Sequence, residues 1–83
     1  MYYVYFLQSE DKNHFYIGAS KDVDKRLAKH NYGSSKSTRP YRPWKIIHKE
    51  ACPDKQTAMK REYYLKSTSG YLEKKSIINK NST

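Results

Sequence analysis

The segment Tyr2–Gln8 constrains the fold most, because almost every residue in it is aromatic or β-branched. Such residues favour a strand, and alternate side chains of a strand point to opposite faces. Both faces would be apolar or aromatic here: Tyr3, Tyr5 and Leu7 on one, Tyr2, Val4 and Phe6 on the other. A strand of this kind is covered on both sides. The chain therefore needs a central strand with packing elements above and below it.

The next segments predict a hairpin and then a helix. Residues 9–13 are polar and suit a turn, after which His14–Gly18 would return antiparallel. Ser20 or Asp22 can cap a helix that begins near residue 23. Gly33 marks its end, because glycine is the usual residue just beyond a helix.

This helix would present chemically active side chains to the sheet. Val23 begins its buried stripe, His30 falls within that stripe, and Arg26 lies at its edge one turn earlier. Lys25 and Lys29 would point to water, where they can contact a nucleic acid.

The second half of the chain predicts a strand and two helices. The strand covers Lys45–Ala51, and a helix capped by Asp54 runs to about residue 67. The last helix begins at residues 69–71 and would bury three side chains: Leu72, Ile77 and Ile78. We expect one domain over residues 1–79 and a flexible tail over residues 80–83.

The charge indicates a polyanionic partner. The 83 residues carry 17 Lys and Arg against 8 Asp and Glu, a formal charge of +9. On a small domain this excess points to nucleic acid, the alternative being a solvated basic surface with no specific partner. Cys52 is the single cysteine, which excludes a disulfide framework. Without a signal-peptide pattern or a membrane-length apolar run, we expect a cytoplasmic protein.

The segment GSSKSTRPYRPW, which follows the first helix, has no acidic residue. Its cations Lys36, Arg39 and Arg42 alternate with Tyr41 and Trp44, a pattern that suits phosphate contact combined with base stacking. An equally weighted alternative is a solvated loop whose two aromatic residues fold back over the core.

Glu62 is the sharpest anomaly in the sequence. On a helical wheel it falls inside the apolar arc that holds Ala58 and Leu65. A carboxylate that faces a core is costly unless it is paired or binds a metal. Glu62 either holds a metal ion, or pairs with Arg26, Arg61 or a lysine, or reaches water at an edge.

Five side chains, each with an ordinary structural explanation by itself, together suit phosphodiester cleavage: Tyr5, Tyr16, Arg26, His30 and Glu62. A single carboxylate and waters can hold Mg²⁺, and a guanidinium can clamp a phosphate. A tyrosine whose pKa is lowered by a nearby cation could take a proton from water.

These residues resemble a known family. Tyr3–Tyr5 and Tyr16–Gly18 resemble the two halves of the GIY-YIG nuclease signature, and the match continues at Arg26 and His30. Ala58–Glu62 is similar to the family's helix with a metal-binding glutamate. The resemblance covers nearly the whole chain and is strongest with the small stand-alone bacterial members.

The resemblance implies an α+β fold with a small three-stranded antiparallel sheet flanked by helices, in the order β-β-α-β-α-α. It also implies hydrolysis that depends on Mg²⁺ or Mn²⁺. Tyr5 and Tyr16 would be the motif tyrosines, with Tyr5 the first choice as general base. Arg26 would stabilise the phosphoryl charge, His30 would assist proton transfer, and Glu62 would hold the metal.

Three further positions bear on the resemblance. Tyr3 stands where the signature has its first glycine. Gly18 would allow a close backbone approach at the end of a strand. Asn79 is the nearest candidate for an asparagine that joins the site in many members, and its late position gives it little weight.

We therefore expect an endonuclease, with DNA favoured over RNA and with repair or processing as its role. The first alternative is a nucleic-acid-binding module that keeps the fold without cleavage. A basic partner of ribosomes or other proteins would explain the charge and leave the five residues unexplained.

Overall fold

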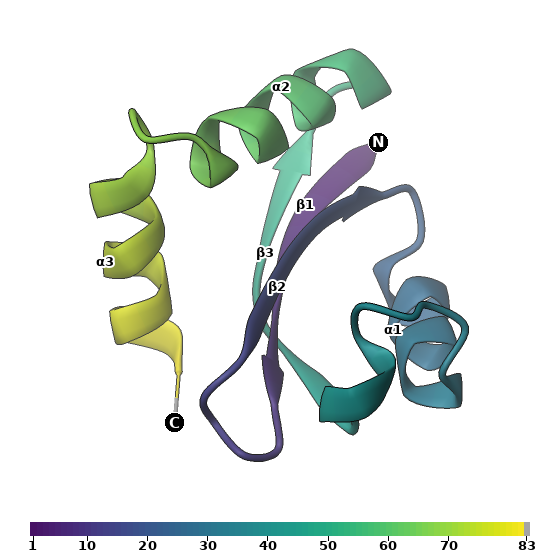
Figure 1. The fold of residues 1–83 in the computed structure, drawn as a ribbon. Coiled ribbons are helices and arrows are strands. Elements are labelled where there is room, and N and C mark those ends of the chain that lie inside the picture. The colour runs from purple at the N-terminus through teal and green to yellow at the C-terminus, as the bar shows by residue number, and fades with distance from the viewer. Residues whose placement is uncertain (83) are drawn as a thin grey trace.

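The computed structural model describes residues 1–82, and β1 (Tyr2–Ser9) is its central strand (Figure 1). β2 (Phe15–Ser20) and β3 (Trp44–Cys52) pair with its two edges, both antiparallel, in the order β2-β1-β3. The predicted central strand is confirmed. It is apolar on both faces because both faces are covered.

The helices lie on opposite sides of this sheet. α1 (Val23–Tyr32) and the short 3-10 helix η1 (Arg39–Tyr41) cover one face, and α2 (Lys55–Lys66) and α3 (Tyr71–Asn81) cover the other (Figure 1). The order β-β-α-β-α-α and the small α+β architecture are as predicted.

The alternation of β1 builds two separate cores. Towards α1 the buried side chains are Tyr5, Leu7, Val23 and Trp44. Towards α2 and α3 they are Val4, Phe6, Ile17, Cys52, Ala58 and Leu65. Catalytic candidates on the α1 side are thereby anchored in a packed layer.

Local signals fix the helix ends. The Asp22 carboxylate accepts a hydrogen bond from the Lys25 N–H at 3.1 Å, so Asp22 is the N-cap of α1. Gly33 ends α1 in the left-handed region, with a φ of 95°. Asp54 caps α2 by accepting from the Thr57 N–H at 2.8 Å, as predicted.

The strands differ from the prediction at their ends. β2 begins at Phe15 and continues to Ser20, past the expected end at Gly18, because its last residues still pair with β1. β3 is one residue longer at each end than expected. Gly18 therefore lies inside a strand.

The prediction that Leu72 is buried is wrong. Ile77 and Ile78 pack against the core, whereas Leu72 is 81% exposed. At 3.6 residues per turn, Leu72 lies about 140° and 240° around the helix from these two residues. It therefore points away from the sheet. α3 runs to Asn81, and residue 83 of the predicted tail lies outside the described residues.

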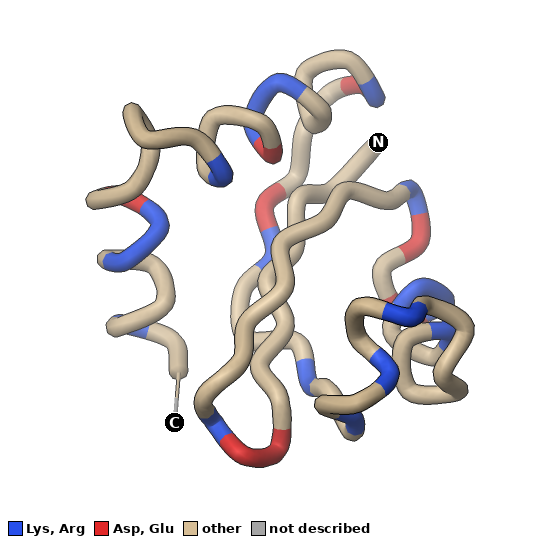
Figure 2. The backbone as a smooth tube through the Cα atoms, in the orientation of Figure 1, with Lys and Arg blue, Asp and Glu red and all other residues tan. Residues whose placement is uncertain are grey.

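The charged residues lie on the helices, on the loops and on β3. β1 carries no charged residue, and Lys and Arg gather on the helices and on the loop after α1 (Figure 2). Among residues 1–82, no helix combines the length and apolar character that crossing a membrane requires.

Candidate active site

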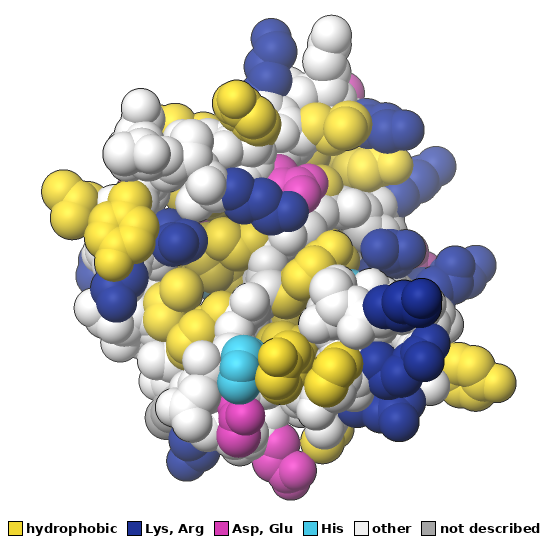
Figure 3. Space-filling view, in the orientation of Figure 1, with side chains coloured by type: hydrophobic (Ala, Val, Ile, Leu, Met, Phe, Trp, Pro, Cys, Tyr) yellow, Lys and Arg dark blue, Asp and Glu magenta, His cyan; other side chains and the backbone are white. Residues whose placement is uncertain are grey.

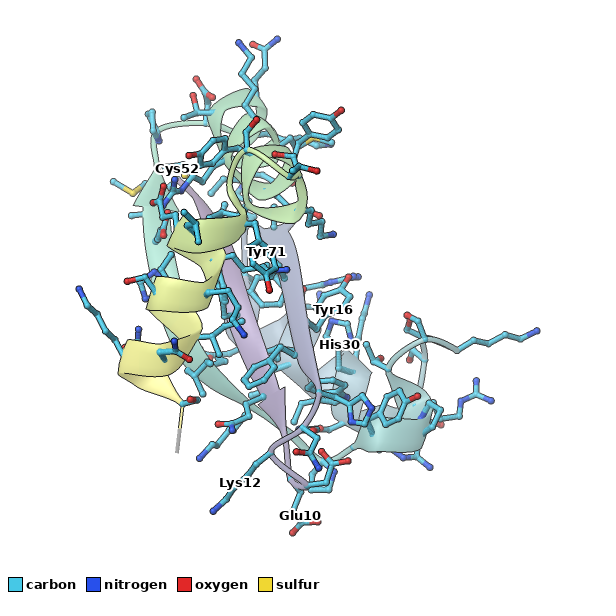
Figure 4. All side chains as sticks on the ribbon, turned by 60° about the vertical axis from the view of Figure 1, so that its left-hand side comes forward. Glu10, Lys12, Tyr16, His30, Cys52 and Tyr71 are labelled. Atoms are coloured by element: carbon cyan, nitrogen blue, oxygen red, sulfur yellow. The ribbon has the colours of Figure 1, made fainter. Side chains whose placement is uncertain are left out.

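Three elements bring three of the predicted residues into one cluster. Tyr5 on β1 and His30 on α1 are almost fully buried, and the Tyr5 Oη lies 3.3 Å from the His30 Nε2. The Tyr16 ring, from β2, lies 4.6 Å from the His30 ring and 6.2 Å from the Tyr5 ring, centroid to centroid. Figure 4 shows Tyr16 and His30 side by side at the edge of the sheet.

Gly18 makes room for this cluster. It sits opposite Tyr5 in the sheet, and a Cβ atom on it would lie 2.6 Å from the Tyr5 Oη and 2.9 Å from the Tyr16 Cε2. The Tyr5 ring thus lies across the bare backbone of β2. Glycine is therefore required at position 18 because the Tyr5 side chain, from the neighbouring strand, packs closely against its backbone.

Arg26 adds a permanent positive charge. A hydrogen bond with the Tyr5 hydroxyl is the main reason that the pKa of Arg26 is raised, so the guanidinium stays charged. Its Nε is buried and has no hydrogen-bond partner within residues 1–82. Buried donors are nearly always satisfied, so this N–H is available to an oxygen of a bound ligand.

Burial sets the protonation of the central pair. It raises the pKa of Tyr5, and this outweighs the lowering by Arg26. Burial also lowers the pKa of His30, and the Arg26 charge lowers it further. Near neutral pH the pair is a phenol and a neutral imidazole. The pKa of Tyr5 moves in the direction opposite to the one expected of a tyrosine base.

The hydrogen bonds favour one proton arrangement. The Tyr5 phenol keeps its proton and is influenced by the positive Arg26, so its O–H donates to the His30 Nε2. The imidazole proton then lies on Nδ1, 3.0 Å from the Thr38 Oγ1. His30 thus presents its free lone pair to Tyr5.

Thr38 is the functional candidate that sequence reasoning missed. It is 2% exposed, and besides contacting His30 it accepts a hydrogen bond from the Trp44 Nε1–H at 2.9 Å through its carbonyl. It lies in an irregular loop, where no periodicity indicates which hydroxyl turns inward. The absence of a pattern left no signal to find it.

Glu62 lies at the edge of the cluster. Its side chain is 24% exposed, and it accepts a hydrogen bond from the Lys66 Nζ at 2.6 Å. Pairing with a lysine is one of the alternatives that the sequence left open. The negative charge of Glu62 contributes to the raised pKa of Tyr5, and the Lys66 Nζ lies 5.7 Å from the Tyr16 ring centroid. The charges of two α2 side chains, Glu62 and Lys66, therefore act on the tyrosines of the cluster.

The donor set at Glu62 fits Mg²⁺ or Mn²⁺. No group of three or more His, Cys, Asp or Glu side chains within residues 1–82 could enclose a metal. Mg²⁺ commonly binds one or two carboxylates, waters and substrate phosphates, and does not need such an enclosure. The Glu62 carboxylate is partly exposed, so it can offer an oxygen to such an ion.

The loop arginines are partly committed to α1. The Arg39 Nε–H donates to the Gly33 carbonyl at 2.7 Å, and an Arg42 Nη1–H donates to the Tyr32 carbonyl at 3.0 Å. These bonds satisfy carbonyls at the end of the helix. The other cations proposed for nucleic-acid contact are exposed: Lys25, Lys29 and Lys36. Figure 3 shows Lys and Arg side chains clustered over this part of the surface.

The two loop aromatics behave differently. Trp44 is 5% exposed and belongs to the core, as the structural alternative proposed. Tyr41 stays 38% exposed and stacks on His14, with 3.7 Å between the ring centroids. Of the two, only Tyr41 keeps its ring at the surface.

Asn79 is exposed near the end of α3.

A second charged cluster joins β3, α2 and α3. The Arg61 guanidinium donates to both carboxylate oxygens of Glu50, at 2.8 and 3.1 Å, and also bonds Glu73. His48 pairs with Glu50 at 2.9 Å. Arg61 therefore links α2 to β3 and α3, and the ion-pair partner of Glu62 is Lys66.

Known proteins match this chain over most of its length. The model of the GIY-YIG catalytic domain matches residues 1–76. A UPF0213 protein of Staphylococcus saprophyticus is 38% identical over 69 residues, which are 82% of this chain and 83% of that protein. One from Halobacterium salinarum is 39% identical over 70 residues, covering 83% and 90% of the two chains.

A solved structure also matches. The solution NMR structure of a UPF0213 protein from Bacillus halodurans aligns with a TM-score of 0.55 and 35% identity. The alignment covers 98% of this chain and 87% of that one.

Proposed function

Because the chain belongs to the GIY-YIG catalytic domain family, which implies a nuclease-like function on nucleic acid, we propose that it is a metal-dependent endonuclease. One observation carries the proposal. A buried tyrosine–histidine pair lies beside a guanidinium that keeps an unpartnered donor. Phosphodiester hydrolysis needs both a proton path and a positive clamp.

Arg26 would bind the scissile phosphate. Its Nε–H is free to donate to a phosphoryl oxygen, and its charge would offset the negative charge that grows there during attack.

Tyr5 and His30 would move the proton of the attacking water. The water gives a proton to the Tyr5 oxygen while the Tyr5 O–H proton passes to the His30 Nε2. This relay makes Tyr5 the immediate acceptor even though burial raises its pKa, because no free phenolate is needed. Tyr16, whose ring lies tilted against the His30 ring, would orient the water or the phosphate.

Glu62 would hold the divalent ion, Mg²⁺ or Mn²⁺. When bound, such an ion supplies neutralisation of phosphoryl charge and activation of water. Lys66 must first release the Glu62 carboxylate, and it can then pair with a phosphate instead.

DNA is favoured over RNA as the substrate, with a role in repair or processing of nucleic acid and an expected place in the cytoplasm. The charge of +9 and the exposed lysines support a nucleic-acid substrate of either kind.

A binding module without cleavage is the second candidate. The Lys66–Glu62 ion pair favours it, because it gives the carboxylate a partner without any metal. In that case Arg26 and the surface lysines would bind phosphates, and the Tyr5–His30 pair would be structural.

The test is cleavage of labelled single-stranded, duplex, flapped and branched DNA and RNA in the presence of Mg²⁺ or Mn²⁺. Glu62→Gln and Arg26→Lys remove the carboxylate charge and the forked guanidinium. Glu10→Gln, in the exposed hairpin turn, is the matched control. We expect cutting that needs metal, is lost in the first two variants and is kept in the third. Binding of every substrate without cutting by the unaltered protein would establish the binding module instead.

A further inference from the structure

A groove of about 620 Å³ lies between β2 and α3, beyond the catalytic cluster. Three aromatic rings and three lysines line it: Phe15, Tyr16, Tyr71, Lys66, Lys74 and Lys75. Figure 3 shows hydrophobic side chains beside α3 with lysines close to them. The roles proposed above leave four of these residues without a function: Phe15, Tyr71, Lys74 and Lys75.

The groove shares two residues with the site and its surroundings. Tyr16 lines the groove and its ring also contacts the His30 ring, so the groove and the site share one ring. Lys66 is shared as well, because it pairs with Glu62 and lines the groove. In Figure 4, Tyr71, Tyr16 and His30 follow one another along the flank of β2. A chain held in the groove would therefore lead into the catalytic cluster.

The aromatic rings are presented together with cations. Tyr71 is 49% exposed and has the Lys74 Nζ 5.0 Å from its ring centroid. Tyr16 has the Lys66 Nζ 5.7 Å from its own centroid. Rings that accept stacked bases, alternating with ammonium groups that accept phosphates, are typical of sites for single strands.

All the charged residues that line the groove are lysines. None of its lining residues is acidic, and only Lys66 has a carboxylate partner within the described chain. Its volume suits one or two nucleotides, in the range of ordinary ligand pockets. A duplex keeps its bases stacked inside and offers no ring face to Phe15 or Tyr71. Charge and shape together favour unpaired nucleotides.

We propose that this groove binds a single-stranded segment of nucleic acid that continues into the catalytic cluster. Tyr71 and Phe15 stack with bases, and Lys74 and Lys75 contact the phosphates. The link to a scissile phosphate rests on the proposed nuclease function, whereas the binding itself does not. The substrate class is then an unpaired strand, or an unpaired strand next to a duplex.

The experiment measures binding in EDTA, so that cleavage plays no part. Fluorescent oligothymidylate, oligouridylate and a hairpin duplex are titrated with the unaltered protein, Tyr71→Ala, and a Lys74→Ala, Lys75→Ala double variant. Tyr63→Ala and Lys80→Ala are matched controls, because both residues are exposed on the same helical layer and neither lines the groove. Thermal unfolding verifies that every variant is folded.

We expect Tyr71→Ala to weaken single-strand binding about 5- to 100-fold, the usual effect of removing one stacking platform. The double lysine variant should weaken binding and flatten its dependence on salt, by about 0.7 in logarithmic slope for each phosphate that is no longer neutralised. Tyr63→Ala and Lys80→Ala should bind like the unaltered protein. Oligothymidylate compared with oligouridylate distinguishes DNA from RNA as the source of the strand.

Three results would overturn the proposal: equal binding by Tyr71→Ala and Tyr63→Ala, a duplex that binds as tightly as a single strand, or competition by polyglutamate as strong as by oligothymidylate. The nuclease is judged separately. Binding that depends on Tyr71 without any cleavage would support the proposed groove and contradict the proposed nuclease activity. Cleavage by the unaltered protein, combined with unchanged single-strand binding by Tyr71→Ala, would contradict the proposed groove and support the nuclease activity.

Discussion

The Thr38 Oγ1 lies 3.0 Å from the His30 Nδ1, on the side of the imidazole opposite to Tyr5. A loop hydroxyl thus holds the histidine in the orientation and tautomer that present its Nε2 lone pair to the phenol. In the proposed relay, Thr38 touches neither water nor phosphate. It is a positioning residue that acts through His30.

Thr38→Val tests this relationship, because valine keeps the shape and removes the hydroxyl. We expect cleavage to fall about tenfold or more in kcat with little change in KM, since general acid–base assistance is worth about 10²–10⁴ and would be partly lost. Thr38→Ser should restore most of the rate. A purely structural threonine would lower the melting temperature and leave the pH profile of kcat unmoved, and that result would contradict the assignment.

The pH dependence follows from the lowered pKa of His30. Only the neutral imidazole can accept the proton, so cleavage should be constant near neutrality and fall on the acid side, with an apparent pKa below the ordinary 6.5. The free energy of unfolding should likewise fall on the acid side. A depressed histidine pKa favours the folded state above pH 6.5, and this contribution is lost as the pH falls through the folded-state pKa.

His30→Gln should remove that part of the pH dependence of unfolding. Urea unfolding of both proteins between about pH 7 and 5 provides the measurement, with the ordinary histidine pKa inside the window. An acid limb of cleavage above 6.5 in the unaltered protein would exclude His30 as the neutral acceptor.

Gly18→Ala should disturb the site, because the added methyl group would displace the Tyr5 ring. The new Cβ would lie 2.6 Å from the Tyr5 Oη and 2.7 Å from its Cζ, and the buried ring has no space to move into. Overpacking of this kind costs about 1–3 kcal/mol. Because Tyr5 must shift, we expect cleavage to fall further than stability alone would explain.

A double-mutant cycle identifies the cause. In a Tyr5→Leu background the ring is gone, so the cost of Gly18→Ala should shrink to less than half, measured by chemical unfolding. An unchanged cost would place the strain elsewhere in β2.

Much of the site follows from two periodicities. The alternation of β1 places Tyr5 on the face that α1 covers, and the helical repeat turns Arg26 and His30 towards that same face. Both were predictable because each residue lies in a regular element with a clear apolar side. The same regularity does not extend to Thr38, whose loop has no repeat.

Two other features depend on where elements end and how deeply they are buried. The helical wheel places Glu62 in an apolar arc, but α2 crosses the edge of the sheet, so this position reaches water and Lys66. The direction of the Tyr5 pKa shift depends on the balance between burial, the largest cause, and Arg26, and the depth of burial follows from the packed structure.

Lys66 should hold back metal binding. Its Nζ occupies the Glu62 carboxylate at 2.6 Å, and a divalent ion would have to displace it or bind next to it against like-charge repulsion. Lys66→Met removes the competing cation. We expect Mn²⁺ to bind about two- to tenfold more tightly, in keeping with the modest strength of a partly exposed ion pair. Titration calorimetry or the electron paramagnetic resonance of free Mn²⁺ measures this directly. Nucleic acid is left out, because Lys66 also lines the groove.

Two variants control the Mn²⁺ titration. Lys60→Met removes an exposed lysine from the same helix and should leave the affinity unchanged. Glu62→Gln should abolish binding in both the native and the Lys66→Met backgrounds. Unchanged Mn²⁺ affinity in Glu62→Gln would show that the ion binds elsewhere. Weaker affinity in Lys66→Met would show that the lysine orients the carboxylate for the metal, which is the opposite of competition.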